Sequence, residues 1–197
     1  TDTPEPYEIN ITLFEAIKES FKKEVNLCME RFICVHAIML SLEGVPAFYI
    51  HSLFGTKNDY ELYEQTNQNR SLNRGKIRIS EIDLSKESEP ESYIFLQLRK
   101  LMFIRKKQPA FHPNAVQFTL HLGSNLYGIW RQSLDKKQSI FCISNLTDKE
   151  VSLSLLDLNL IGFDHWRDLI TEIEIDDMTS EIELKPYQTL WLTNLQD

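Results

Sequence analysis

A short apolar run that leads directly into a long polar segment is the feature that most constrains the fold. Residues 45–50 are almost wholly apolar, and residues 51–74 are mostly polar. Segments with helical periodicity precede and follow this pair. Helix, buried strand, long loop and helix, in that order, form one unit of a parallel α/β architecture. The sequence therefore predicts a buried strand at residues 45–50 and a long loop after it.

The polar segment is rich in hydrogen-bonding side chains, namely Asn58, Asp59, Asn67, Asn69, Arg70, Asn73 and Arg74. A long loop without apolar periodicity is usually functional or disordered, and in α/β barrels the loops after strands build the active-site face. These side chains would suit a hydroxyl-rich ligand, or they make turns in a solvated loop. His51 lies just past the predicted strand, at the end that would face an active site, and is a further candidate.

Three segments have helical periodicity. Residues 13–21 place their apolar side chains on one face, and residues 92–107 are amphipathic with a basic last turn. Residues 27–42 are apolar on almost all sides, which predicts a helix buried in a large protein. His36 within it is expected to be a core histidine with a satisfied hydrogen bond.

Beyond Pro109 the apolar period changes from 3.6 to 2. Turn-forming residues separate six candidate strands, at residues 116–121, 126–131, 139–144, 151–155, 182–184 and 189–193. Short strands at near-regular spacing predict an antiparallel sandwich or sheet. Trp130, Trp166 and Trp191 in this part are either a sugar-stacking platform or, as is more common, core residues of a β-domain.

Composition excludes several classes of protein. The net charge of −8 disfavours nucleic acid as a main partner. No apolar run approaches the length of a membrane span without charge, so no membrane partner is expected. Three cysteines without Cys-x-x-Cys spacing predict reduced thiols in a cytoplasmic protein. No metal site is expected.

Two motifs resemble a known enzyme family. Residues 42–49, Leu-Glu-Gly-Val-Pro-Ala-Phe-Tyr, resemble the eighth barrel strand of the alpha-amylase family, which usually has Gly-x-Pro-x-x-Tyr there. Residues 55–59 and 66–74 are similar to the branch of that family that contains sucrose phosphorylase and glucosylglycerate phosphorylase. Residues 141–147 and 186–192 look like the central and closing strands of the family's C-terminal β-domain.

The resemblance implies a fold that is α/β plus all-β. Residues 1–107 would be the last part of a (β/α)8 barrel, with one strand and flanking helices, and residues 108–197 a C-terminal antiparallel β-sandwich domain. The family's motifs for the carboxylate nucleophile and the general acid are absent from this chain. The resemblance therefore implies a C-terminal fragment of a longer retaining glucosyl-transferring enzyme, which is inert alone.

Arg70 is the functional residue that the resemblance carries over. Arg70-Ser71-Leu72-Asn73-Arg74 matches an Arg-x-x-Asn-Arg pattern whose first arginine holds the glucosyl group and pairs with an aspartate from an early barrel strand. An arginine fork suits such a buried carboxylate. Asn73 and Arg74 are expected to shape the loop. His51 and Asp59 are further candidate substrate-binding residues.

The resemblance also implies substrates and partners. The whole enzyme would pass glucose from an α-glucoside, such as sucrose or glucosylglycerate, to inorganic phosphate as co-substrate, without another cofactor. A hydrolase or transglucosidase of the same family is one alternative. A carbohydrate-binding or assembly module with Trp130, Trp166 or Tyr127 as a platform is another. Apolar surface on the helix at residues 27–42 and the strand at residues 45–50 would be covered by the missing N-terminal barrel portion or by a homo-oligomer.

Overall fold

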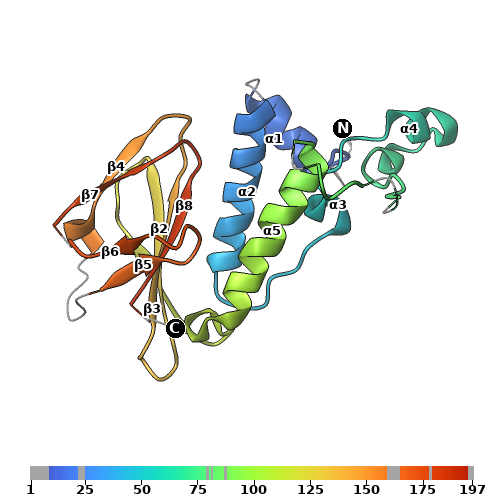
Figure 1. Cartoon of the computed structure of the whole chain (residues 1–197). Coiled ribbons are helices and arrows are strands. Elements are labelled where there is room, and N and C mark those ends of the chain that lie inside the picture. The colour runs from blue at the N-terminus through green and yellow to red at the C-terminus, as the bar shows by residue number, and fades with distance from the viewer. Residues whose placement is uncertain are drawn as a thin grey trace, which may run out of the picture. The chain divides into compact units, whose positions relative to one another are not determined.

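The computed structural model describes residues 9–21, 25–78, 80, 82–86, 88–158, 165–177 and 179–194. The chain forms two compact units. Unit 1 comprises Thr1–Lys23 and Phe48–Leu96, and unit 2 comprises Glu24–Ala47 and Gln97–Asp197 (Figure 1). The division into a barrel part and a β-domain at residue 107 stays a prediction.

Unit 1 is helical. It contains α1 (Leu13–Phe21), α3 (Ile50–Leu53), α4 (Tyr60–Thr66), the 3₁₀ helix η1 (Asn69–Asn73) and the first part of α5 (Pro90–Lys107). The helices predicted at residues 13–21 and 92–107 are confirmed.

The first part of α5 packs against the chain just after α3. The rings of Phe54 and Phe95 stack with their centroids 5.0 Å apart. Gly55 has φ +55°, and a Cβ at this position would collide with Ile94. Only glycine combines this left-handed backbone with so close an approach to a neighbouring side chain.

The sequence predicts one long loop for the polar segment, and this prediction is wrong. Helix α4 and the 3₁₀ helix η1 lie within the segment. The Asp59 side chain accepts a hydrogen bond from the backbone N–H of Leu62 at 2.8 Å, which caps the start of α4. Asn67 ends α4 in the left-handed conformation, with φ 49°. These residues are start and stop signals of a helix, which the prediction of a loop overlooked.

The strand predicted at residues 45–50 is not formed. Residues 45–49 have no regular secondary structure, and Ile50 begins α3. The side chains of Val45 and Ile50 are 82% and 47% exposed. A strand needs a neighbour to pair its backbone groups, and in the described part of the chain no segment pairs with these residues.

Unit 2 combines helix α2 (Val25–Ser41), the last part of α5 and the 3₁₀ helix η3 (Pro109–Phe111) with all the strands. The helix predicted at residues 27–42 is confirmed. His36 is buried, its Nδ1 lies 2.8 Å from the carbonyl oxygen of Phe32, and burial lowers its pKa. The expectation of a core histidine with a satisfied hydrogen bond is therefore confirmed.

The strands form two antiparallel sheets. The larger sheet has the order β1 (Val116–Leu120), β2 (Leu126–Gln132), β3 (Ser139–Asn145), β8 (Thr189–Thr193), β5 (Trp166–Asp168) and β6 (Glu174–Ile175), and the smaller pairs β4 (Val151–Ser154) with β7 (Glu181–Leu184). The predicted antiparallel architecture and its six strands are confirmed. The sequence analysis missed β5 and β6.

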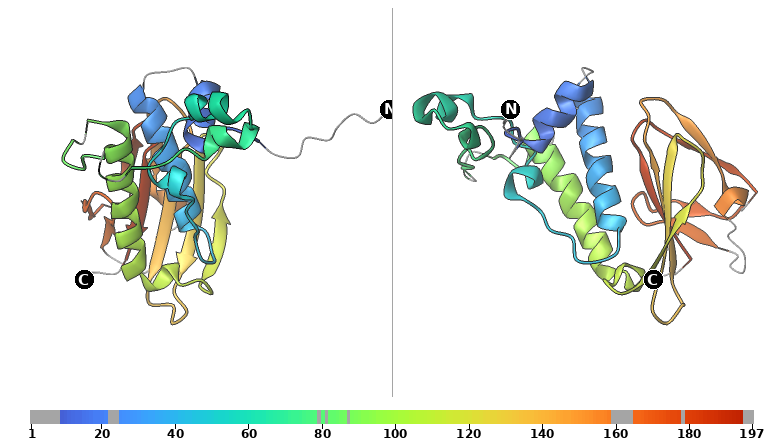
Figure 2. Two further views of the ribbon diagram at one scale, coloured as in Figure 1. Left: turned by 90° about the vertical axis from the view of Figure 1, so that its right-hand side faces the viewer. Right: turned by 180° about the vertical axis from the view of Figure 1, so that it is seen from behind.

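Strand β3 is the centre of unit 2 and is buried along its whole length. Phe141 and Ile143 belong to a hydrophobic cluster with Leu153 and Leu184 of the smaller sheet. On the other face of β3, α2 lies alongside the larger sheet (Figure 2). The sheet is thus covered on both faces, which explains why every residue of β3 is buried and why its central residues 140–143 are apolar.

The three tryptophans do not form an exposed platform. Trp166 and Trp191 are only 2% and 0% exposed. Trp130 stacks between Phe118 and Phe141, with ring centroids 4.8 and 5.8 Å away. The interpretation of these residues as β-domain core is confirmed, and the interpretation as a joint sugar-stacking platform is wrong.

Within the described ranges, no helix combines the length and apolar character required to cross a bilayer.

Candidate functional site in unit 1

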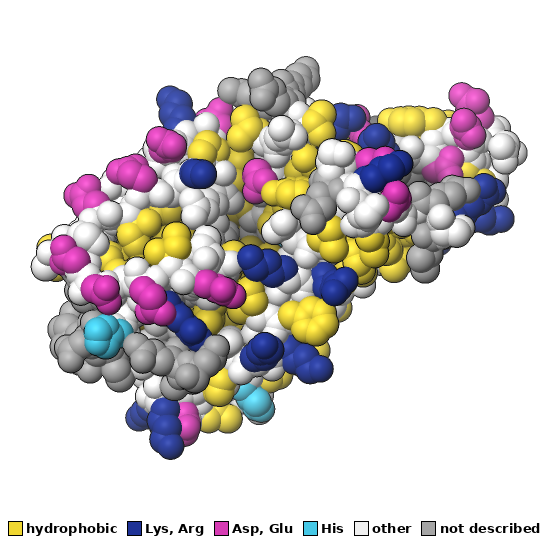
Figure 3. All heavy atoms as spheres, viewed as in Figure 1, with side chains coloured by type: hydrophobic (Ala, Val, Ile, Leu, Met, Phe, Trp, Pro, Cys, Tyr) yellow, Lys and Arg dark blue, Asp and Glu magenta, His cyan; other side chains and the backbone are white. Residues whose placement is uncertain are grey.

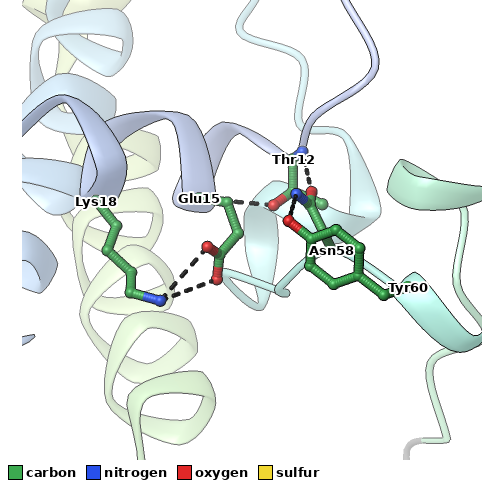
Figure 4. Close-up of polar contacts among 5 residues, drawn as sticks. All are labelled: Thr12, Glu15, Lys18, Asn58 and Tyr60. Carbon is green, nitrogen blue, oxygen red and sulfur yellow. Dashed lines mark hydrogen bonds and ion pairs between the residues drawn. The ribbon is translucent and has the colours of Figure 1, made fainter.

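The side chain of Asn58 ties the start of α1 to the polar segment (Figure 4). The backbone N–H of Thr12 donates to Asn58 Oδ1 at 2.8 Å, and Asn58 Nδ2 donates to Tyr60 Oη at 3.2 Å. Thr12 Oγ1 also accepts from the N–H of Glu15, whose carboxylate pairs with Lys18 at 3.3 Å. The oxygen and nitrogen of the Asn58 amide are therefore both used to build the unit.

Asp59 also has a structural role. Its carboxylate caps α4, and its backbone N–H donates to the carbonyl oxygen of Leu72 at 2.8 Å. Gly75 approaches so closely that a Cβ there would lie 2.8 Å from Asp59 Oδ2. The segment thus folds back on itself around this carboxylate.

His51 is held by its neighbour Thr56 and is 9% exposed. Its Nδ1 lies 2.9 Å from Thr56 Oγ1, and its carbonyl oxygen accepts from the Thr56 N–H at 3.0 Å and from the Thr56 hydroxyl at 3.4 Å. Burial lowers the pKa of His51 below its ordinary value, so the ring is neutral at pH 7.

Two open hollows meet at His51. The first, of about 450 Å³, is lined by His51, Asp59 and their neighbours along the polar segment. The second, of about 600 Å³, is lined by His51, Tyr49, Asn73 and Arg74. Tyr49 Oη donates to the carbonyl oxygen of Asn73 at 3.2 Å, which fixes this wall.

The structure thus brings together two of the three candidate residues. His51 and Asp59 line the same hollow, whereas Arg70 lies outside the lining of both hollows. Arg70 is exposed on η1. The neighbouring residue Ser71 fixes the turn that carries Arg70. Ser71 is buried, and its hydroxyl lies 2.6 Å from Thr66 Oγ1. The role of Arg70 as glucosyl anchor stays a prediction.

Tyr49 is a lining residue that the sequence does not single out as a candidate. Arg74 also lines this hollow, and the sequence places it among the hydrogen-bonding side chains of the polar segment and predicts that it shapes the loop. The sequence spacing between Arg74 and Tyr49 does not predict that they line the same hollow. The hydrogen bond from Tyr49 Oη to the carbonyl oxygen of Asn73 brings the tyrosine to this wall. The family motif that includes Tyr49 was the only available pointer.

The hollows offer hydrogen bonding rather than a pair of catalytic carboxylates. Among the residues that line them, Asp59 and Glu61 are the only carboxylates, and Asp59 is engaged as a helix cap. Glycoside chemistry of the retaining type needs two carboxyl groups on either side of the scissile bond. Among the described residues no three His, Cys, Asp or Glu side chains gather closely enough to hold a metal ion.

The sequence of this chain is similar to those of known sugar phosphorylases. No family model matches the sequence. The chain is 35% identical over 193 residues to the glucosylglycerate phosphorylase of Escherichia coli (strain K12), a match that covers 96% of this chain and 33% of that protein. It is 34% identical over 194 residues to the glucosylglycerate phosphorylase of Allomeiothermus silvanus, covering 97% of this chain and 32% of that protein. The chain therefore spans about a third of the length of these relatives.

Solved structures share the fold at low sequence identity. A pullulanase from Anoxybacillus sp. LM18-11 matches 94% of this chain and 26% of its own, with a TM-score of 0.67 and 13% identity. An Anoxybacillus alpha-amylase matches 95% of this chain and 36% of its own, with a TM-score of 0.64 and 13% identity. The predicted fold class, part of a barrel followed by an antiparallel β-domain, is confirmed.

Proposed function

We propose that this chain, a relative of the sugar phosphorylases of the alpha-amylase family, is the C-terminal part of a retaining enzyme that transfers glucose from an α-glucoside to inorganic phosphate. The observation that carries the proposal is the similarity to glucosylglycerate phosphorylases over 96% of the chain. Glucosylglycerate is the first candidate donor, because the match to the sucrose phosphorylase of Agrobacterium vitis covers only 54% of the chain. A cytoplasmic location is part of the same proposal, and it is supported by three buried cysteines that form no disulfide.

The proposed reaction has two steps. A carboxylate attacks the anomeric carbon of the donor, the glycosidic bond breaks, and a general acid protonates the leaving oxygen. An oxygen of phosphate then attacks the glucosyl-enzyme, releases the carboxylate and forms α-glucose 1-phosphate, while its proton returns to the acid. Both carboxyl groups come from the part of the enzyme outside this chain, and no further cofactor is needed.

In this proposal Arg70 contributes most to substrate binding. Its guanidinium holds the far hydroxyls of the glucosyl group and pairs with an aspartate from outside the chain, and the fixed turn at Ser71 positions it. Neutral His51, which lines both hollows, offers a hydrogen bond to a sugar hydroxyl. Asp59 has an indirect role, because by capping α4 it holds the fold of the segment that carries Arg70 and His51.

The exposed apolar side chains of the chain fit a larger enzyme. Val35, Val45 and Ile50 are all exposed. We expect the N-terminal barrel portion of the whole protein, or a second copy of the chain, to cover them, since monomers rarely leave such surface open.

The proposal is tested on the whole protein with glucosylglycerate as donor. In phosphate buffer we expect α-glucose 1-phosphate, identified with its anomeric configuration by NMR, and in phosphate-free buffer no comparable turnover. Release of free glucose at the same rate without phosphate would identify a hydrolase. A β-configured product would exclude retention, and faster turnover of sucrose or glucosylglycerol would replace the proposed donor.

A further inference from the structure

A further hollow lies in unit 2, and none of its lining residues belongs to the two hollows of unit 1. Its volume is about 410 Å³, and it is bounded by α2, by the part of α5 after Gln97 and by the loops at residues 170–171 and 185–189. This size is within the range of pockets that bind small molecules.

The walls of this hollow are apolar. Leu27, Ile33 and Ala37 line it from α2, Leu101 from α5 and Tyr187 from the loop before β8. Tyr187 has φ +56°, a conformation that bulky residues rarely adopt and that persists only where the surroundings fix it. Its backbone N–H donates to the carbonyl oxygen of Thr147 at 3.2 Å, which is one such restraint.

Two polar lining residues, Cys34 and Thr189, are already paired. The thiol of Cys34 donates to the carbonyl oxygen of Asn145 at 3.7 Å and accepts from Thr189 Oγ1 at 3.9 Å. Thr189 Oγ1 also lies 2.8 Å from Ser144 Oγ. A ligand group that lay against Cys34 and Thr189 would find their polar atoms already paired, so an apolar group fits there best.

The rim carries an excess of positive charge. Lys100 and Lys185 line it, both are exposed, and neither ammonium group forms an ion pair with any residue that the structure describes. Glu30 is the only carboxylate of the lining. On the face drawn in Figure 3, basic side chains follow α5 while acidic side chains gather over the strands. The positive rim is therefore a local feature of a chain with a net charge of −8.

We propose that this hollow binds a small amphipathic carboxylate, a medium-chain or aromatic acid. Its apolar body lies against Ile33 and Leu101, and its carboxylate is attracted to the ammonium groups of Lys100 and Lys185. This binding site is separate from glucosyl transfer and does not depend on the function proposed above.

The test measures binding directly on the whole protein by calorimetry, with octanoate as probe and octanol as its uncharged match. We expect octanoate to bind at least tenfold more tightly than octanol. The double variant Lys100→Gln/Lys185→Gln should lower octanoate affinity to that of octanol. Lys107→Gln, which removes a lysine of the same helix outside this hollow, should leave both affinities unchanged.

Filling the hollow provides the second arm of the test. Ile33→Trp, at a half-buried position, should abolish binding of both probes while circular dichroism and the unfolding temperature remain those of the unchanged protein. Equal affinity for octanoate and octanol, full octanoate binding by the double lysine variant, or unchanged binding by folded Ile33→Trp would each overturn the proposal. Because no enzymatic turnover is measured, failure of the proposed reaction has no effect on these outcomes.

Discussion

Arg131 on β2 donates a hydrogen bond to the carbonyl oxygen of Ser41, the last residue of α2, at 2.8 Å across 90 positions of sequence. The same guanidinium donates to the carbonyl oxygens of His112 and Ala115. Arg105 donates in parallel to the carbonyl oxygen of Leu40 at 2.7 Å. Two arginines thus satisfy carbonyl groups that the end of a helix leaves without intrahelical partners.

Replacing Arg131 by Met should lower the free energy of unfolding by about 3–5 kcal/mol, because the fully buried guanidinium satisfies carbonyl groups that would then lose their partner. Urea unfolding followed by tryptophan fluorescence measures the loss. Arg99→Met, which alters an exposed arginine of α5, should change stability by no more than about 0.5 kcal/mol. Equal effects of the two variants would show that Arg131 does not hold the end of α2.

Asn58→Ala should loosen the start of α1. The backbone N–H of Thr12 loses its 2.8 Å acceptor, which costs about 1 kcal/mol. Faster hydrogen exchange of the first amides of α1, relative to those of α2, provides the measurement. Asn69→Ala, at an exposed position of the same segment, is the matched control and should leave exchange in α1 unchanged.

Arg70→Ala in the whole protein should reduce kcat/KM for the glucosyl donor by roughly a hundredfold or more. The reason is that removing one partner of a buried charge pair costs about 3–5 kcal/mol. Arg78→Ala changes a nearby exposed arginine and should leave kcat/KM close to that of the unchanged enzyme. Turnover by Arg70→Ala at the full rate would remove this residue from the substrate-binding site.

Burial of His36 predicts a loss of stability in acid. Its pKa in the folded chain is below the ordinary value of 6.5, so on acidification the unfolded chain takes up the proton first. The free energy of unfolding should therefore fall as the pH decreases below 6.5, by up to about 1.4 kcal/mol per pH unit from this group. Denaturant titrations of His36→Gln should show a weaker pH dependence in this range, whereas His121→Gln, at an exposed position, should not.

The thiols of Cys28, Cys34 and Cys142 are buried, and none of them is part of a disulfide. Burial raises the pKa of Cys34 and Cys142, which lowers the fraction of reactive thiolate. We expect a thiol reagent at neutral pH to label these cysteines only as the chain unfolds in urea. Rapid labelling of Cys34 in the native protein would instead show that the hollow beside it opens to the reagent.

The sequence predicted most of the helices and strands because each has its own periodicity. Strands β5 and β6 have three and two residues and carry no such pattern. Their position comes from pairing, as in the register of Arg167 with Thr193 and of Arg167 with Glu174. The strand expected at residues 45–50 shows the opposite case, since its sequence favours a strand but no described segment pairs with it.

The candidate site was predicted less well, for a different reason. Polar residues in a loop can bind a ligand or hold the loop together, and spacing does not distinguish the two roles. Asn58 and Asp59 both hold the loop, through Thr12 and Leu62. The position of His51 just past the predicted strand makes it a candidate, and the structure places it in the lining of both hollows.

The contact between Cys34 and Thr189 has a consequence for synthesis of the protein. These residues are 155 positions apart, so α2 leaves the ribosome long before β8 exists. Contacts between distant parts of a chain form slowly because a large loop must close first. Until β3 and β8 have been made, α2 therefore leaves exposed the side that will face the larger sheet.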